Sequence, residues 1–203
     1  MKTATQRLPD TWMLATDPDN AGRAGRWFAE PQPDARPAAV PGIIQQVFPG
    51  YHGVAWYWTR LEPQRLPAAD ERAILSFGAV DYLAEVWVNG VAVGGYEGGE
   101  TPFELDVTAP LRAGANLIAV RVVNPGNEPV DGLVLAEIPH RNKKVPPRSG
   151  HSLNSGGILY PVELAIVSDL RVADVFAMPD TATGRIGLSV TLLRGMLRRL
   201  VPG

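Results

Sequence analysis

Short runs of apolar and β-branched residues recur along the whole chain, separated by polar, glycine or proline residues. Several runs alternate apolar with polar residues, as a strand with one face in a core requires. Few segments show the 3.6-residue period of an amphipathic helix. The pattern predicts an all-β sandwich or barrel of many short strands. The expected strands cover residues 55–61, 73–77, 82–88, 91–93, 103–107, 117–123, 158–167, 172–177 and 186–192.

The dipeptide Asn89-Gly90 lies between two of these runs. A two-residue type I′ turn needs positive φ at both central positions, which Asn-Gly tolerates best. Residues 82–93 should therefore form a hairpin, and its first strand should be central because both of its faces carry apolar residues. The glycines at 94–99 could suggest a phosphate loop, but no Lys-Ser/Thr pair follows and Glu97 and Glu100 flank them. We expect a loop there.

Composition excludes several classes of function. The chain has 203 residues, no cysteine, and 19 basic against 21 acidic side chains, a net charge of −2. Disulfides, thiol catalysis and cysteine-bound zinc are ruled out, and nothing favours binding to nucleic acid or to an anionic membrane. We see neither a signal peptide nor a run of about 20 apolar residues, and we expect a cytoplasmic protein.

Two polar segments rich in proline and glycine interrupt the strands, at residues 124–132 and 138–157. Long segments of this kind in compact domains usually carry function or are disordered. After Ser168-Asp169, which reads as a short joint, residues 170–193 predict two strands around a turn. Two strands do not make a stable domain by themselves, so this part looks like the beginning of something larger.

The ordered set of segments resembles the N-terminal sugar-binding domain of glycoside hydrolase family 2, which includes β-galactosidases, β-glucuronidases and β-mannosidases. The densest resemblance is LSFGAVDYLAEVWVNGVAVGGYEGGETPFELDVTAPLRAGANLIAVRVVNP. Weaker segments resemble the family before and after it, at residues 12–28, 40–63, 154–167 and 174–192. The set resembles the family over nearly all of the chain from Trp12 to Leu192.

The resemblance implies a galactose-binding-like jelly-roll sandwich over residues 1–168. Residues 169–203 would be the truncated beginning of an immunoglobulin-like domain and a tail. In intact family members a TIM barrel follows and carries both catalytic glutamates, and such a barrel needs roughly 250 more residues. We therefore expect a non-catalytic accessory domain of an enzyme that hydrolyses O-glycosyl bonds.

A retaining glycosidase needs two carboxyl groups about 5 Å apart. Glu128 follows an asparagine, as the family's acid/base glutamate does, but it comes after a sandwich strand and reads as a solvated turn residue. Asp131 and Glu137 lie on the same loop region and could contact a ligand, although most loop acids only face water.

The segment before the closing strand carries the sharper hypothesis. In β-galactosidases and β-glucuronidases this segment reaches the substrate pocket. Asn154 agrees with the glucuronidase-like pattern, but His151 stands where those enzymes have an aspartate, which puts galactoside or glucuronide specificity in doubt. Either residue could contact a sugar or only pack the loop.

Aromatic residues and short acidic groups offer two further readings. Trp56 and Trp58 share one face of their strand, and we expect one of them, with Trp58 the stronger candidate, to be exposed as a sugar platform. Trp87 should be core. Asp17, with Asp19 and Asn20, has the chemistry of a structural calcium site, but we favour an Asx turn and assign no cofactor or metal.

Three functions remain open from the sequence. The first is a fragment without activity of its own. The second is a freestanding carbohydrate-binding module, which an exposed Trp/Tyr strip would favour. The third is a subunit that docks on a separately encoded catalytic chain, or dimerises, through the strands after Val172. The expected partners are a carbohydrate and a catalytic barrel domain or a second copy of the chain.

Overall fold

The computed structural model describes residues 4–138 and 154–194 of the chain. Apart from three single-turn 3₁₀ helices, all its regular elements are strands, which confirms the all-β prediction. The helices are η1 (Trp27–Ala29), η2 (Ile44–Gln46) and η3 (Leu135–Glu137). The strands are β1 (Ala4–Arg7), β2 (Thr11–Asp17), β3 (Arg36–Ala39), β4 (Gly53–Leu61), β5 (Glu71–Phe77), β6 (Val80–Asp81), β7 (Leu83–Val88), β8 (Val91–Glu97), β9 (Phe103–Asp106), β10 (Asn116–Asn124), β11 (Gly157–Ile158), β12 (Val162–Ser168), β13 (Leu170–Asp180) and β14 (Arg185–Arg194).

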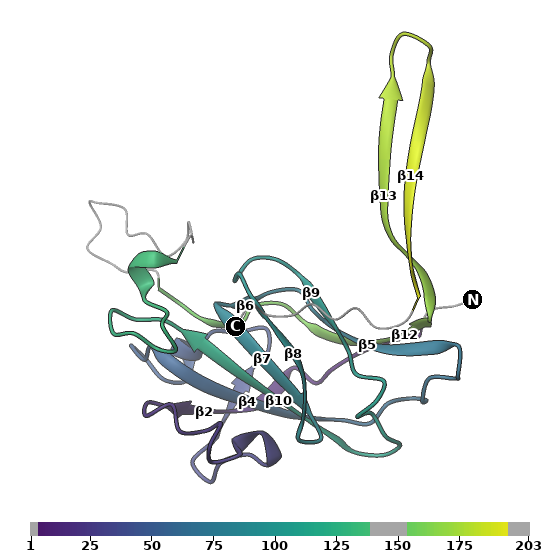
Figure 1. Ribbon diagram of the computed structural model, residues 1–203. Coiled ribbons are helices and arrows are strands. Elements are labelled where there is room, and N and C mark those ends of the chain that lie inside the picture. The colour runs from purple at the N-terminus through teal and green to yellow at the C-terminus, as the bar shows by residue number, and fades with distance from the viewer. Residues whose placement is uncertain (1–3, 139–153, 195–203) are drawn as a thin grey trace.

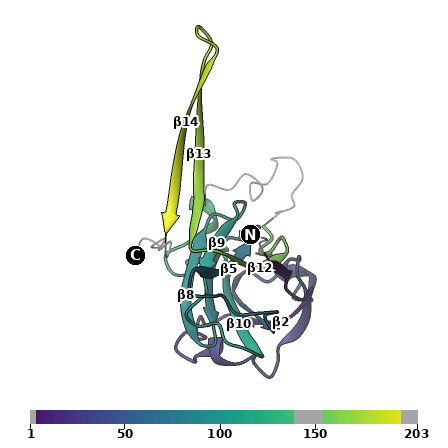
Figure 2. The ribbon, with the colours of Figure 1, turned by 90° about the vertical axis from the view of Figure 1, so that its right-hand side faces the viewer.

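Two antiparallel sheets pack face to face as a jelly-roll sandwich (Figures 1 and 2). The larger sheet has the order β3-β2-β4-β10-β7-β8, and the smaller has the order β1-β12-β5-β9. The short pair β11-β6 lies beside them. No helix in the described ranges is both long and apolar enough to span a bilayer.

The period of two in β4 and β10 divides the larger sheet into an inner and an outer face. Along β10, Ile118 and Val120 lie in the core between the sheets, whereas Ala119 and Val123 lie in a second cluster on the outer face. Tyr57 of β4 likewise belongs to the inner core. The strongest apolar runs of the sequence are therefore central strands with both faces covered.

The predicted hairpin is present as β7 and β8, and β7 is central as expected. Asn89 and Gly90 have φ of 52° and 79°, the positive values of a type I′ turn. The glycines that follow were expected in a loop, but β8 continues to Glu97. Gly95 packs directly on β7, because a Cβ there would meet the Ala84 carbonyl oxygen at 2.3 Å. The glycine thus serves close strand pairing, not a loop.

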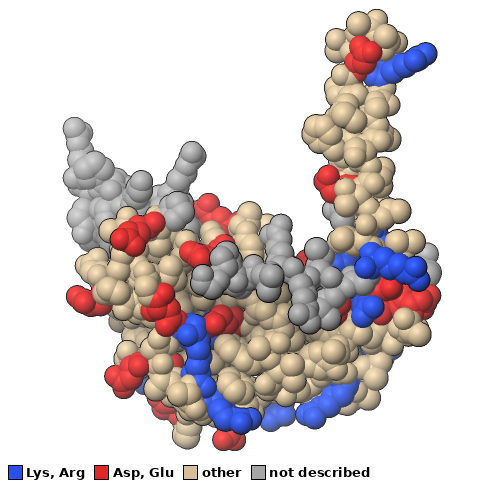
Figure 3. All heavy atoms as spheres, viewed as in Figure 1, with Lys and Arg blue, Asp and Glu red and all other residues tan. Residues whose placement is uncertain are grey.

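Strands β13 and β14 pair only with each other and project from the sandwich as a long hairpin (Figures 1 and 2). This confirms the two strands predicted around a turn. The side chains that alternate along β14 share one face, and all are at least 50% exposed. Figure 3 shows the shaft of this hairpin as mostly uncharged. The alternating exposed residues are Ile186, Leu188, Val190 and Leu192.

The joint between the sandwich and the hairpin is held by polar contacts. The backbone nitrogen of Asp169 donates to the Asp70 carbonyl oxygen at 2.8 Å. The Arg72 guanidinium forms an ion pair with the Asp169 carboxylate at 2.6 Å. Strand β12 thus ends at a fixed point, from which the hairpin departs.

Candidate functional site

The outer face of the six-stranded sheet carries an aromatic layer. Trp56, Trp58 and Trp87 lie side by side there, with Trp27 and Phe28 from the β2–β3 connection packed against them. The Phe28 and Trp87 rings stack with centroids 5.4 Å apart. Trp87 is buried as expected.

The expectation that Trp56 or Trp58 is exposed is wrong. Trp56 is 0% and Trp58 is 1% exposed, because the η1 segment covers this face. The Trp58 indole nitrogen donates to the Trp27 carbonyl oxygen at 2.7 Å, and this hydrogen bond helps to hold η1 over the Trp58 ring. Trp58 therefore presents no open face on which a sugar could stack.

Asp17, at the end of β2, organises the connection that carries η1. Its carboxylate accepts from the backbone nitrogens of Ala21 at 2.8 Å and Gly22 at 2.9 Å, and from the Trp56 indole at 2.9 Å. Asn20 points elsewhere, toward Arg121. Within the two described ranges, no three His, Asp or Glu side chains converge as a metal site requires.

A buried ionic network, which we call the Arg121 network, lies next to this loop. Arg121 projects from the middle of β10 and is 0% exposed. Its two terminal nitrogens donate to Glu85 at 2.7 Å, to Asn20 at 2.6 Å and to Asp131 at 2.7 Å. The guanidinium of Arg23 contacts the same two carboxylates from the solvent side. One buried cation thus joins β7, β10 and two loops.

Asp131, a predicted ligand contact, is a member of this network. Partial burial by itself would raise the pKa of Asp131. The hydrogen bond from Asn20 and the charges of Arg121 and Arg23 outweigh burial, and the pKa lies below its ordinary value. Asp131 is therefore a fixed anion that orders its loop, and it is poorly suited to donate a proton as a general acid.

A second cluster, the amide network, lies where β10 ends. Asn124 donates to the Asn154 amide oxygen at 2.8 Å, and Asn154 donates to the Pro125 carbonyl oxygen at 2.7 Å. The amide of Gln45 donates to Asn124 at 2.8 Å. His52 lies within 3.2 Å of both asparagines, as donor or acceptor according to its tautomer. Asn154 is 4% exposed, so the structure places it as a buried anchor.

The other predicted residues separate. Glu137 ends η3 and is exposed, and Glu128 lies on an exposed bend, as the solvated-turn reading expected. His151 lies outside the described residues. We call the loops at the end of β10 and the start of β4 the rim. Asp131 and Glu137 lie on the chain that follows β10, and Asn154 is hydrogen-bonded to Asn124 at the end of β10. Strands β10 and β4 are labelled in Figure 1.

Sequence reasoning missed Arg121, Asn124, Glu85 and His52. A signal existed for the first, because a charged residue inside the apolar run LIAVRVV must be paired if its strand is central. The other three residues gave no such signal. Strand pairing brings Glu85 to Arg121, and the fold brings His52 to Asn124, although the members of each pair are distant in sequence.

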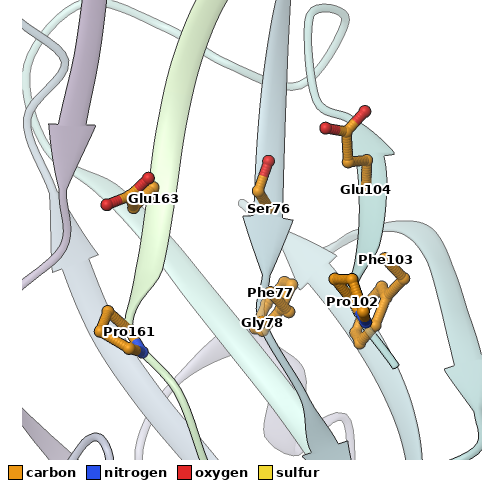
Figure 4. Close-up of a pocket in the computed structure, with 8 residues that line it drawn as sticks. All are labelled: Ser76, Phe77, Gly78, Pro102, Phe103, Glu104, Pro161 and Glu163. Atoms are coloured by element: carbon orange, nitrogen blue, oxygen red, sulfur yellow. The ribbon is translucent and has the colours of Figure 1, made fainter. Parts of the chain in front are cut away.

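A separate cavity of about 370 Å³ lies on the smaller sheet, away from the rim. Glu163, Ser76 and Glu104 lie in a row on β12, β5 and β9, beside Pro161 and Pro102 (Figure 4). Nothing in the sequence pattern indicated this cavity.

Comparison with known proteins defines the family. Residues 43–137 match the family model described as "Glycosyl hydrolases family 2, sugar binding domain". This stretch runs from η2 through β10 to η3. Over residues 43–137 the chain is similar to this family. The resemblance noted in the sequence is thereby confirmed.

Named relatives extend the similarity over more of the chain. A β-glucuronidase of Paenibacillus borealis is 28% identical over 216 residues, which covers 93% of this chain and 34% of the relative. A β-galactosidase of Thermoanaerobacter pseudethanolicus is 33% identical over 140 residues, which covers 64% of this chain and 16% of the relative. In solved structures, a Faecalibacterium prausnitzii β-glucuronidase has a TM-score of 0.70 at 26% identity, covering 94% of this chain and 36% of that one. The chain thus spans about a third or less of these relatives' length.

Proposed function

We propose that the chain is a non-catalytic sugar-binding domain that acts together with a glycoside hydrolase catalytic domain. In this proposal the sugar binds at the rim. The observation that carries the proposal is the amide network, because its hydrogen bonds fix Asn154 and Asn124 at the end of β10.

The electrostatics of the rim support a binding role over catalysis. A glycosidase needs one carboxyl group that can donate a proton and a second that acts as nucleophile or base. Glu85 on β7 and Asp131 on the loop after β10 are both engaged by Arg121 and Arg23. Partial burial raises the pKa of Asp131, but the hydrogen bond from Asn20 and the charges of Arg121 and Arg23 keep this pKa below its ordinary value. In this proposal the catalytic carboxyl groups come from outside these residues.

The proposal also assigns the two parts of the chain. Residues 1–168 are the jelly-roll domain, and residues 169–203 begin a second, immunoglobulin-like sandwich. The hairpin supports this assignment, because the exposed apolar face of β14 has the alternation of a strand that packs on another sheet. The same face is the observation that favours the second candidate function, docking on a separate catalytic chain.

The freestanding-module reading gains no support from the tryptophans. It required an exposed aromatic strip, but the rings at Trp56 and Trp58 are covered. Tyr160, at 58% exposure, is an exposed aromatic residue beside the cavity of the smaller sheet.

The test is calorimetric titration of the chain with galactosides, glucuronides and mannosides, with nitrophenyl-glycoside turnover assayed on the same sample. We expect saturable binding without turnover. The variant Asn154→Ala should weaken binding about tenfold or more, because the Asn124 amide nitrogen loses its acceptor and the Pro125 carbonyl oxygen loses its donor. The matched control is Asn127→Ala, an exposed asparagine on the same loop, which should leave affinity unchanged.

Two results would count against the proposal. Turnover by the purified chain would contradict the non-catalytic role. If circular dichroism shows that the Asn154 and Asn127 variants are both folded, and the two bind the sugar with equal affinity, the rim is not the sugar-binding site.

A further inference from the structure

The cavity on the smaller sheet differs chemically from the rim. Its polar side chains come from three neighbouring strands in one register row, since Glu163 pairs with Ser76 and Ser76 pairs with Glu104. Two strand spacings place the outer two residues about 10 Å apart at their Cα atoms. Neither glutamate forms an ion pair with another described residue.

Cations near the row do not neutralise these two glutamates. Arg7 stands opposite Glu163 on β1, but its guanidinium pairs with Asp10 at 2.7 Å. Arg72 lies four residues before Ser76 on β5, and this even spacing places it on the same face as the row. Its guanidinium pairs with Asp169. The cavity therefore offers two carboxylates and one hydroxyl as hydrogen-bonding groups.

Apolar surfaces complete the cavity. Pro102 and Pro161 lie beside the row (Figure 4). Gly78 lines the cavity, and a Cβ there would meet the Tyr160 Cβ at 2.5 Å, so the exposed Tyr160 side chain stands directly against this wall. Beneath, the stacked rings of Phe77 and Phe103, with centroids 4.9 Å apart, make a firm base.

We propose that this cavity is a second carbohydrate site, separate from the rim, that binds neutral or amino sugars and rejects uronic acids. The proposal rests on the proposed function as a sugar-binding domain. Sugar hydroxyl groups donate to Glu104, Glu163 and the Ser76 hydroxyl, and the C–H face of the ring lies on the prolines and Tyr160. Hydrogen bonds to a charged acceptor are about twice as strong as neutral ones.

The charge of the cavity sets its selectivity. Two carboxylates without a paired cation repel the carboxylate of a glucuronide, whereas a hydroxyl or an ammonium group meets an acceptor. The volume of about 370 Å³ lies in the range of small-molecule sites. The Arg121 network, which holds the Asp131 loop of the rim, includes the cations Arg23 and Arg121, so the rim does not share this bias.

The experiment compares the full chain with two variants, Glu104→Gln and Glu163→Gln, by calorimetric titration with neutral oligosaccharides, an amino-sugar oligosaccharide and glucuronides. We expect each variant to lose about tenfold in affinity for the neutral sugar, since a charged acceptor becomes a neutral amide. The control Glu30→Gln, an exposed glutamate outside the cavity, should change nothing. All three substitutions are on the surface, and thermal unfolding checks that they fold.

The outcomes separate the two proposals. If the chain binds neutral sugars and both cavity variants bind as tightly as the parent chain, the cavity proposal is overturned and the sugar-binding function stands. If only Asn154→Ala weakens binding, the rim is the sole sugar site. If the parent chain binds glucuronides more tightly than neutral sugars, and Glu104→Gln does not change this preference, the charge argument is overturned. If no carbohydrate binds the parent chain, the proposed function itself fails.

Discussion

Replacing Arg121 by methionine tests whether the Arg121 network holds the rim. Methionine keeps much of the length of the side chain but removes three hydrogen bonds of 2.6 to 2.7 Å from a fully buried guanidinium. Removing one partner of a buried ion pair costs about 3–5 kcal/mol. In the variant, the Glu85 and Asp131 side chains, which are 29% and 27% exposed, still form ion pairs with Arg23. We therefore expect the free energy of unfolding to fall by an amount near the lower end of this range, about 3 kcal/mol.

A loss of about 3 kcal/mol should lower the melting temperature by about 6–12 °C in a chain of this size. Urea unfolding followed by tryptophan fluorescence gives the free energy directly, because Trp56 lies opposite Arg121 on β4. The matched control is Arg23→Met, whose side chain is 43% exposed and should contribute about 1 kcal/mol or less. Equal losses in the two variants, or an Arg121→Met loss under about 1 kcal/mol, would refute the network's role.

Two further changes test electrostatics and packing elsewhere. The Arg65 guanidinium and the Ala68 backbone nitrogen lower the pKa of Glu71 from 4.5 to about 2, so the Glu71 carboxylate stabilises the fold above about pH 4.5 and loses this effect as the pH falls toward 2. The melting temperatures of the parent chain and Glu71→Gln should therefore differ at pH 6 and converge near pH 2; a constant difference would contradict this assignment. Gly95→Ala should cost about 1–3 kcal/mol in urea unfolding, because its Cβ would lie 2.3 Å from the Ala84 carbonyl oxygen. Gly126→Ala, whose nearest neighbour is 3.5 Å away, is the control that should stay near the parent value.

The sheet architecture was readable from the sequence because its causes are local. The Asn89-Gly90 turn and the period of two in β10 depend only on neighbouring residues, and both are confirmed. The extent of β8 was not readable. A glycine pair usually signals a loop, and the contact of Gly95 with Ala84 depends on how closely two strands pair.

The candidate site was only partly readable for the same reason. Asn154 and Asp131 stood out as polar residues on long loops, and both lie at the rim. Their partners Arg121 and Asn124 lie in the middle and at the end of the apolar strand β10. The period of two assigns each side chain to a face of the strand but does not identify the residue that it contacts. Trp58 was misjudged, because the sequence does not reveal that the residues at 27–29 fold back over the outer face of the sheet.

Strand β10 links the two networks of the rim. Arg121 holds the Asn20 and Asp131 loops from the outer face, and three residues later Asn124 holds Asn154 at the strand's end. A binding site whose side chains are already fixed loses less entropy when a ligand arrives. Asp131 and Asn154 have this property, since both are hydrogen-bonded to β10, a central strand of the larger sheet. Substitutions in either network should therefore affect sugar affinity through the position of the rim, even where the substituted residue does not touch the sugar.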